Sequence, residues 1–404
     1  MNIAAYLLLT LYLVFLGADR INFGGEFLES FQLFPHLVIS SIIFLYILLF
    51  RLKDLEFGWI VNKKSTFLSI ICFLMFTIIS IIFSIDIIFS AKRLVLLTII
   101  ISTVVLILSL FSSNELKEYF YYSSLLGSIL FFIFNILLFS NWIGYISYDS
   151  NIINLNPDYI AYFIPRLGGF SSDVNRGVLI LVIYTFFIYI YDKKSLLSNL
   201  IILMNTIFIF ASLSRTAIGC FFITFLIYTI FYSTKIEKIK VLVILPISFI
   251  ILSNIIDYYS SNNVIDIESA LEERLTLNDF GHNTSTGIHF KLIDEGLKIA
   301  FSDLKIFLIG SGLGTSYKVI EGFGMSKKKK ANFHSQYLSI FVENGFFACL
   351  SFLFLTIIIP IFRIRNKMLP LIIGIFCFNQ LYQLTNEPMY WFTILYYYKF
   401  NEHV

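Results

Sequence analysis

The sequence predicts an all-α polytopic membrane protein with about twelve transmembrane helices and one large polar loop. Of its 404 residues, 58% are hydrophobic and only 14% are charged, whereas a soluble domain is typically about 25% charged. The apolar residues come in stretches of about 16–24, which is the length a helix needs to cross roughly 30 Å of hydrocarbon. A single polar interruption, at residues 257–335, breaks this pattern.

Each apolar stretch is interpreted as a helix, because an open chain in lipid has no other way to satisfy its backbone hydrogen bonds. Helices 1–9 are predicted within residues 1–256 and helices 10–12 within residues 336–404, on either side of the loop. The predicted spans lie near 3–18, 33–50, 66–85, 92–112, 118–140, 177–191, 196–213, 216–233, 241–256, 336–360, 368–384 and 390–400. The first stretch has neither a basic start nor a small-residue cleavage site, so we interpret it as a retained span and not a signal peptide.

Basic residues in the short loops predict sidedness, because Lys and Arg accumulate in cytoplasmic loops. One set of alternate loops, with the C-terminal tail, holds 14 basic residues: Arg51, Lys53, Lys63, Lys64, Lys117, Lys193, Lys194, Lys235, Lys238, Lys240, Arg363, Arg365, Lys367 and Lys399. The other set holds six: Arg20, Lys92, Arg93, Arg166, Arg176 and Arg215. Both termini are therefore predicted to be cytoplasmic. The loop at 257–335 is predicted to be outside, which is periplasmic in a two-membrane bacterium.

The four cysteines make a disulfide framework or a zinc site improbable. Cys72, Cys220, Cys349 and Cys377 all fall within apolar stretches, and no Cys-x-x-Cys pair occurs. Neither a disulfide nor a cysteine-bound zinc is therefore expected.

The first outer motif runs from Pro165 to Phe170 (PRLGGF) and continues through Asn175 and Arg176 into a span. Glycines beside Arg166 permit close approach of the backbone to a ligand. A helix N-terminus with a nearby arginine binds phosphate well. The alternative is an ordinary turn followed by a helix cap.

The second outer motif, Ser212–Ala217 (SLSRTA), lies between two apolar spans with almost no loop. An arginine so close to the membrane is costly unless it has a partner. Arg215 is therefore the arginine that we most expect to act on substrate. The alternative for each of the six outer basic residues is that it reaches the lipid phosphates.

Within the large loop, residues 288–305 show helical periodicity. One face of this predicted helix holds Leu292, Ile293, Leu297, Ala300, Phe301 and Leu304. Such a helix could lie on the bilayer surface or cap the bundle of spans. The glycine-rich segment Gly310–Gly314 (GSGLG) that follows is expected to be a flexible turn. No βαβ unit surrounds it, which argues against a nucleotide-binding loop.

The most specific motif is Asn332–Leu338 (NFHSQYL), where polar loop becomes apolar helix. A lone histidine is more often structural, but His334 at an interfacial cleft could act as a general base. Gly345, inside the following helix, is expected to allow tight helix packing.

In this order the motifs resemble the O-antigen polymerase and O-antigen ligase superfamily. The resemblance rests on Arg-x-Gly-Gly…Asn before a span, Ser-Arg-Thr between spans, Gly-Ser-Gly-x-Gly in the outer loop, His-Ser-x-x-Leu…Glu-x-Gly, and the ending Leu384–Pro388…Trp391. Ser335 stands where this family commonly has Asn. The similarity covers roughly residues 66–395 and implies a GT-C-like fold.

The resemblance implies a metal-independent glycosyltransferase in the bacterial inner membrane, with no metal site and no cofactor. Its donor is a glycan on undecaprenyl diphosphate, and its other partners are the growing polymer, membrane lipids and a chain-length regulator, with no nucleic acid. The expected substrate-binding residues are Arg166, Arg215, Lys92, Arg93, Arg176 and Arg274. His334 and Arg215 are the expected catalytic residues, with Arg215 on the diphosphate and His334 on the acceptor.

Polymerisation of repeat units is the first functional prediction, and three alternatives stay open. A ligase that transfers glycan to lipid A–core shares the donor chemistry. A lipid-linked oligosaccharide flippase is disfavoured because the sequence shows no internal repeat and its charges gather at one face and one loop. A purely structural scaffold is the last alternative.

Overall fold

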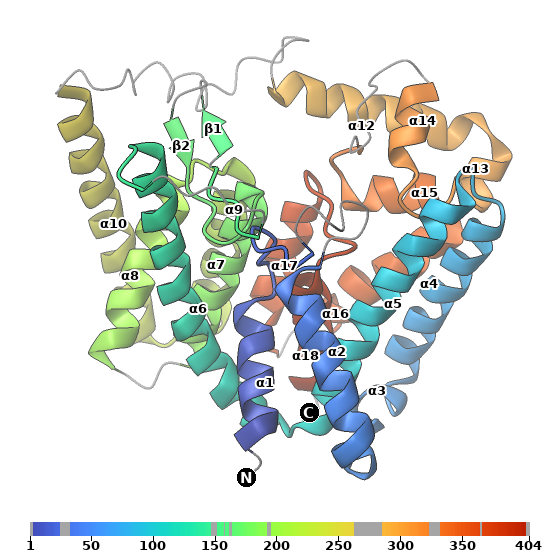
Figure 1. Cartoon of the computed structure of the whole chain (residues 1–404), viewed down its shortest axis with the longest axis horizontal. Helices are drawn as coiled ribbons and strands as arrows, with labels where there is room; N and C mark the ends of the chain where they lie inside the picture. The colour runs from blue at the N-terminus through green and yellow to red at the C-terminus, as the bar shows by residue number, and fades with distance from the viewer. Residues whose placement is uncertain are drawn as a thin grey trace. The chain divides into compact units, whose positions relative to one another are not determined.

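The computed structural model describes residues 3–24, 33–146, 152–156, 158–160, 164–191, 195–261, 285–322, 332–363 and 366–400. The chain divides into two compact units. The first unit consists of residues 1–55 and 110–276, and the second consists of residues 56–109 and 277–404. Each unit is built mainly of helices (Figure 1).

The first unit packs its helices around α7. Its elements are α1 (Ile3–Val14), α2 (Pro35–Tyr46) with the turns η2 (Ile47–Arg51) and η3 (Leu52–Asp54), α6 (Ser113–Trp142), the strands β1 (Asp158–Ile160) and β2 (Ile164–Arg166), α7 (Val174–Ile190), α8 (Leu196–Ala211), α9 (Arg215–Phe231) and α10 (Lys235–Ser261). Helix α7 contacts α6, α8 and α9, and every residue from Gly177 to Tyr189 is buried. A helix that is apolar on all sides is stable at such a central position. The two strands form an antiparallel pair in which Asp158 lies opposite Arg166.

The second unit is centred on α15. Its elements are α3 (Gly58–Val61), α4 (Lys64–Ile82), α5 (Ile87–Leu110), α12 (Ser285–Ser302), α13 (Leu304–Leu308), α14 (Ser316–Gly322), α15 (Gln336–Leu353) with η4 (Phe354–Ile358) and α16 (Ile359–Ile361), α17 (Leu369–Asn379) and α18 (Pro388–Phe400). Helix α15 packs against α4, α12 and α13. Helix α18 is buried from Pro388 to Lys399 and contacts α3 and α17.

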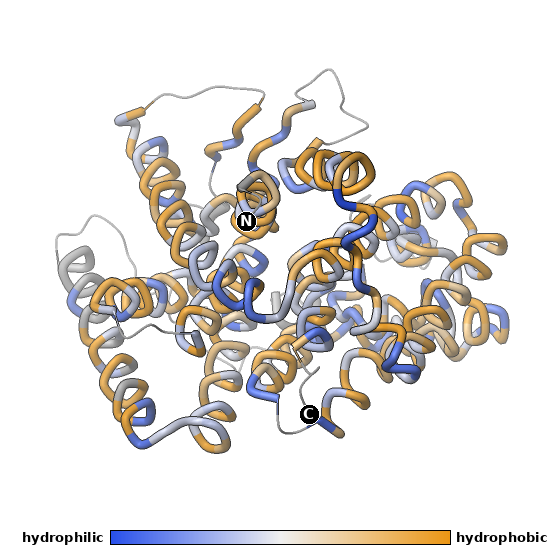
Figure 2. The backbone as a smooth tube through the Cα atoms, turned by 90° about the horizontal axis from the view of Figure 1, so that it is seen from below, coloured by the Kyte–Doolittle hydropathy of each residue, from blue (hydrophilic) through white to orange (hydrophobic). Residues whose placement is uncertain are grey.

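The structure confirms the helical fold class. A helix overlaps each of the twelve predicted spans. Among the described residues, five helical stretches are long and apolar enough to cross a membrane: Pro35–Asp54, Lys64–Ile82, Ile87–Leu110, Ser113–Trp142 and Gln336–Ile361. Others, such as α1 and α17, are apolar but shorter, so the count of twelve spans stays a prediction. Figure 2 shows long hydrophobic stretches along the helices, with hydrophilic residues mainly near their ends.

The helix predicted over 288–305 is present as α12, followed by α13, and its predicted apolar face is buried only in part. Leu292 and Ala300 are buried, whereas Leu297, Phe301 and Leu304 are exposed. One edge of the apolar face therefore packs against the unit, and the other edge points outward.

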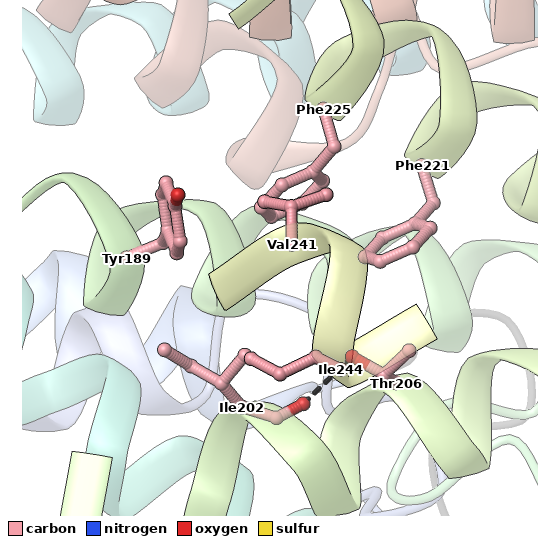
Figure 3. A pocket seen from close by; sticks show the side chains of 7 residues that line it. All are labelled: Tyr189, Ile202, Thr206, Phe221, Phe225, Val241 and Ile244. Atoms are coloured by element: carbon pink, nitrogen blue, oxygen red, sulfur yellow. Dashed lines mark hydrogen bonds between the residues drawn. The ribbon is translucent and has the colours of Figure 1, made fainter. Parts of the chain in front are cut away.

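A small apolar cavity lies among α7, α8, α9 and α10 (Figure 3). Its volume is about 10 Å³, and the hydroxyl of Thr206 beside it already donates to the carbonyl of Ile202 at 2.7 Å. Such a volume is close to that of a single water. This cavity is therefore a packing defect and not a substrate site.

Membrane sidedness gives a first testable prediction. Lys298 on α12 and Lys238 near the start of α10 are both exposed. We expect Lys298→Cys, but not Lys238→Cys, to react with an impermeant thiol reagent in intact spheroplasts, because the basic loops predict opposite sides. The four native cysteines should first be replaced. Labelling of Lys238→Cys alone would reverse the predicted topology.

Candidate active site

In the first unit, Asn175 brings the two predicted arginine motifs together. The hydroxyl of Ser214 donates to Oδ1 of Asn175 at 2.7 Å. Nη2 of Arg166, at the end of β2, donates to the same oxygen at 3.5 Å. Ser214 is also the N-cap of α9, because its hydroxyl accepts the backbone N–H of Ala217. The PRLGGF and SLSRTA segments therefore meet on one amide side chain.

Arg215 is exposed at the first position of α9. A cation at a helix N-terminus is unfavourable, since the partial positive charge of the helix lies at the same end. An anion there would be attracted by both the guanidinium and the helix terminus. The position of Arg215 thus suits anion binding better than it suits helix stability.

Arg176 has a different environment, although it was predicted to bind substrate. Its guanidinium forms an ion pair with Asp19 and donates from Nε to the hydroxyl of Ser171 at 3.0 Å. Its side chain is 15% exposed. The described contacts of Arg176 therefore tie the loop before α7 to the loop after α1.

Arg20 has a structural role that the sequence did not indicate. Its side chain is buried and donates to the carbonyls of Ser171, Asn154 and Asn156 at 2.9, 3.2 and 2.7 Å. In the sequence it was only one of six outer basic residues. Its burial depends on three carbonyls from distant segments, which no local pattern reveals.

In the second unit, α15 is broken at Gly345. This residue has φ +81° and ψ 177°, far from helical values. The break leaves nearby carbonyls without helical partners, and the glycine-rich segment supplies donors. The N–H of Ser311 donates to the carbonyl of Val342 at 2.9 Å, and that of Gly312 donates to Glu343 at 2.8 Å.

The expectation of a flexible turn at Gly310–Gly314 is therefore wrong. Gly310, Gly312 and Gly314 all have positive φ, and Ser311 and Leu313 are buried. A Cβ on Gly310 would lie 2.2 Å from the carbonyl oxygen of Glu343. The glycines here permit close approach to the broken helix and a left-handed backbone, so the segment is a tightly fitted clamp. We call Gly310–Ser316 the glycine clamp.

The glycine clamp also binds the side chain of Glu343, which is fully buried in α15. The carboxylate accepts the N–H of Gly314 at 2.8 Å, the N–H of Ser316 at 3.3 Å and the hydroxyl of Ser316. A carboxylate at this depth is stable only when it is hydrogen-bonded. These contacts join the side chain of Glu343 to the same segment that caps its backbone.

Arg93 and Lys92, predicted to contact phosphate, lie at the start of α5. The guanidinium of Arg93 lies over the ring of Phe89, 5.1 Å from its centroid. A Cβ on Gly314 would be 3.0 Å from Cγ of Arg93, so this arginine lies against the glycine clamp. Lys92 is exposed beside it.

Asp86, between α4 and α5, holds α14 in place. It pairs with Nζ of Lys318 at 2.8 Å and accepts the hydroxyl of Tyr317 at 3.1 Å. The hydrogen bond from Lys318, followed by that from the N–H of Phe89, lowers the pKa of the Asp86 carboxyl. Asp86 is thus held as a carboxylate, which suits a structural contact better than acid–base catalysis.

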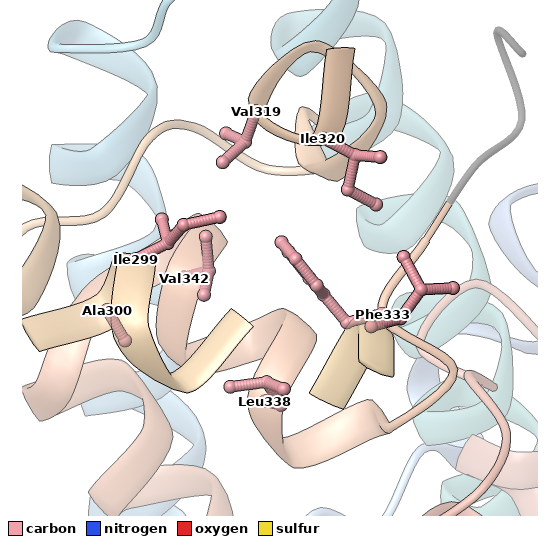
Figure 4. Close-up of a cluster of buried hydrophobic side chains, with 8 residues drawn as sticks. Ile299, Ala300, Val319, Ile320, Phe333, Leu338 and Val342 are labelled. Carbon is pink, nitrogen blue, oxygen red and sulfur yellow. The ribbon is translucent and has the colours of Figure 1, made fainter. Parts of the chain in front are cut away.

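His334 lies on the connection that leads into α15. Phe333 is fully buried in a core formed with α12, α14 and α15, and it points into that core in Figure 4. On the other side of His334, Ser335 is buried and caps α15. The N–H of His334 donates to the side chain of Asn332 at 2.8 Å. Buried neighbours therefore hold a partly exposed imidazole in place.

His334 and Leu213 are the two non-glycine residues with positive φ in the described ranges, at 52° and 51°. Each directly precedes a serine N-cap, Ser335 for α15 and Ser214 for α9. Such a backbone conformation costs on the order of 1–3 kcal/mol and is often associated with functional sites. The strain marks the same two motifs, His-Ser and Ser-Arg-Thr, that the sequence singled out.

The predicted site residues thus fall into two groups. Arg166, Arg176 and Arg215 belong to the first unit, where Asn175 joins the first and last of these segments. Lys92, Arg93 and His334 belong to the second unit. Arg274 lies outside the described residues. Within the described part of the chain, no group of three or more His, Cys, Asp or Glu side chains could hold a metal ion.

The glycine clamp gives a second prediction, on stability. A side chain on Gly345 would require an unfavourable left-handed backbone and place its Cβ 2.4 Å from the carbonyl oxygen of Leu308. We expect Gly345→Ala to destabilise the protein by at least about 2 kcal/mol. Gly219 in α9 is the matched control, because nothing lies within 4 Å of an added Cβ. Gly219→Ala should stabilise by about 0.5–1 kcal/mol.

The measurement is the thermal unfolding midpoint of each purified variant in the same detergent. Equal midpoints for Gly345→Ala and Gly219→Ala would show that the kink at Gly345 does not exist in the folded protein.

Comparison with known families agrees with the sequence motifs. Residues 200–353 match the sequence model of a family described as O-antigen ligase. This range contains Arg215, the glycine clamp, His334 and Glu343, and it leaves out Arg166 and the Leu384–Trp391 ending. The match confirms the resemblance to the O-antigen polymerase and ligase superfamily, whose members are glycosyltransferase-like enzymes that act on lipid-linked glycans. No curated protein matches the chain.

Proposed function

We propose that this protein polymerises undecaprenyl-diphosphate-linked oligosaccharide repeat units into O-antigen or a related surface polysaccharide. The reaction takes place at the outer leaflet of the inner membrane. The observation that carries the proposal is the junction of Ser214, Asn175 and Arg166 beside the exposed Arg215. Two guanidinium groups near a helix N-terminus are suited to a diphosphate.

The chemistry requires a leaving group that gathers negative charge. A hydroxyl of the acceptor sugar attacks the anomeric carbon of the donor, and a new glycosidic bond forms. The bond between that carbon and the diphosphate oxygen breaks, and the lipid diphosphate leaves with the bonding electrons. Arg215, assisted by Arg166, stabilises this charge, and such preorganised groups are usually a large part of catalysis.

His334 accepts the proton of the attacking hydroxyl or orients that hydroxyl. Imidazole suits this role because its ordinary pKa lies close to neutrality. The buried neighbours Phe333 and Ser335 would keep its position constant through the reaction. Lys92 and Arg274 are proposed as further contacts to the substrate. Arg93 and Arg176 are weaker candidates for substrate binding, because their described contacts are to protein groups.

Asn175 and Glu343 are proposed as positioning residues. Asn175 connects Arg166 to the start of α9, and therefore to Arg215. Glu343 connects α15, which begins two residues after His334, to the glycine clamp and so to the neighbourhood of Arg93. Neither residue is proposed to touch the reacting atoms.

Ligation of glycan to lipid A–core is the second candidate. It is favoured by the description of the matched family as O-antigen ligase. The donor and the leaving group are the same, so the proposed roles of Arg215 and His334 would not change. The two reactions differ only in the acceptor.

The glycan phenotype of a deletion distinguishes the candidates. Loss of a polymerase should leave lipid A–core that carries one repeat unit. Loss of a ligase should leave uncapped core together with lipid-linked polymer, and that result would overturn the first proposal. Lipid-linked single repeats that face the cytoplasm would instead indicate a flippase. A chain-length regulator is the proposed protein partner, and co-purification would test it.

A further inference from the structure

The apolar face of α12 has two edges, an inner stripe that is buried and an outer stripe that is exposed, with the partly buried Ile293 between them. The inner stripe includes Leu292, Ile299 and Ala300, which pack with α14, α15 and Phe333 (Figure 4). Gly296 lies on the same side, where an added Cβ would be 2.7 Å from Leu338. The inner stripe is therefore buried against other elements of the second unit.

The outer stripe is exposed. Phe290, Leu297 and Phe301 are 51%, 44% and 66% exposed, and Leu304 at the start of α13 is 73% exposed. At 3.6 residues per turn, the first three fall within roughly 40° of one another around the helix axis. Single exposed apolar residues are ordinary, but an aligned row of large ones marks a contact surface.

The outer stripe is continuous with the surface of a candidate span. The ring centroid of Phe301 lies 5.7 Å from that of Phe307 and 5.7 Å from that of Phe341. The ring of Phe307 lies 5.5 Å from that of Phe341 and stacks on the ring of Phe346, also at 5.5 Å between centroids. Phe346 and its neighbour Phe347 begin the segment after the kink in α15 and are 37% and 44% exposed. That segment belongs to the stretch Gln336–Ile361, which is apolar enough to cross a membrane.

We infer that α12 lies in the membrane interface, with its outer stripe covered by the acyl chains of bilayer phospholipids. An aromatic surface that runs without a break from a candidate membrane span onto α12 is most simply covered by the lipid that would surround that span. The polar side of α12 fits this placement, because Lys298 and Asp294 form an exposed ion pair at 2.6 Å beside the stripe. An amphipathic helix in the interface keeps such groups at the headgroups or in water.

The placement has a consequence for His334. The inner stripe of α12 packs on Phe333, which directly precedes it. A helix anchored in the interface would therefore hold His334 at a fixed depth relative to the leaflet. The inference concerns only the lipid contact and does not depend on the reaction proposed above.

Neighbouring positions on α12 allow a matched test. In a variant without the native cysteines, Leu297→Cys reports on the outer stripe and Lys298→Cys on the adjacent polar side. Each is labelled with an environment-sensitive fluorophore and reconstituted in vesicles of phosphatidylethanolamine and phosphatidylglycerol. We expect nitroxide-labelled lipids to quench the label at 297 several-fold more than the label at 298. Aqueous iodide should show the opposite preference.

Two outcomes would overturn the inference. Equal quenching of both labels by iodide would place the outer stripe in water. A label at 297 that is shielded from iodide but unaffected by nitroxide lipid would show that protein, such as a second copy of the chain, covers the stripe. Because no donor or acceptor is present, either result would leave the proposed glycosyl transfer untouched.

Discussion

Replacing Arg215 with alanine should reduce polymer formation by about 10²–10³-fold, because the departing diphosphate would lose a preorganised cation. Arg215→Lys should stay impaired, since lysine keeps the charge but loses the planar fork that binds two phosphate oxygens at once. The measurement is polymer length and yield in reconstituted vesicles at equal protein levels, together with the affinity for the lipid-linked donor.

Arg51 provides the matched control for this experiment. It lies at the end of the π-helical turn after α2 in the same unit, where it pairs with Asp54. Surface ion pairs of this kind contribute about 0–1 kcal/mol, so Arg51→Ala should keep full activity. Full-length polymer from well-expressed Arg215→Ala would remove this residue from the mechanism.

Replacing His334 should have the second large effect, and the strained backbone permits an unusually clean variant. Glycine adopts positive φ without strain, so His334→Gly removes the imidazole and relieves the backbone at once. If the residue were only structural, this variant would fold and work at least as well as the natural protein. We expect it instead to lose chain extension by about 10²–10⁴-fold, the usual contribution of acid–base assistance.

Leu213→Gly is the control, because Leu213 has nearly the same φ and also precedes a serine cap. It should keep its activity and its thermal stability. Donor binding should stay near normal in His334→Gly, since the imidazole is assigned to the acceptor. Loss of donor binding would move His334 to the diphosphate, and unchanged polymer length would exclude it from the reaction.

The sequence predicted the helices and the order of the motifs well, because both depend on local properties. Apolar length alone places a helix, and the motifs lie at helix ends that this length already marks. Local sequence patterns could not predict the structural role of Arg20 or the ion pair between Arg176 and Asp19. Both depend on which loops meet after the helices have packed.

The conformation of the glycine-rich segment Gly310–Gly314 also could not be predicted from local sequence. Three glycines within five residues are equally typical of a flexible turn and of a backbone forced into close contact. The choice between them depends on the kink at Gly345, some thirty residues later in the chain. The apolar face of α12 shows a related limit, since a period of 3.6 separates apolar from polar positions but does not say which neighbour each apolar side chain meets.

The capping of the broken helix by an earlier segment also bears on how the protein is made. Residues 310–316 leave the ribosome before α15, so the donors for the carbonyls of Val342 and Glu343 already exist when that helix is synthesised. A newly inserted stretch from Gln336 to Ile361 is apolar enough to enter the membrane as one ordinary helix. Its break at Gly345 and the shelter for the Glu343 carboxylate would then form only when the glycine clamp docks. Biogenesis of this unit therefore includes a docking step, and chains that fail it would carry an unprotected acid in the lipid and become substrates for membrane quality control.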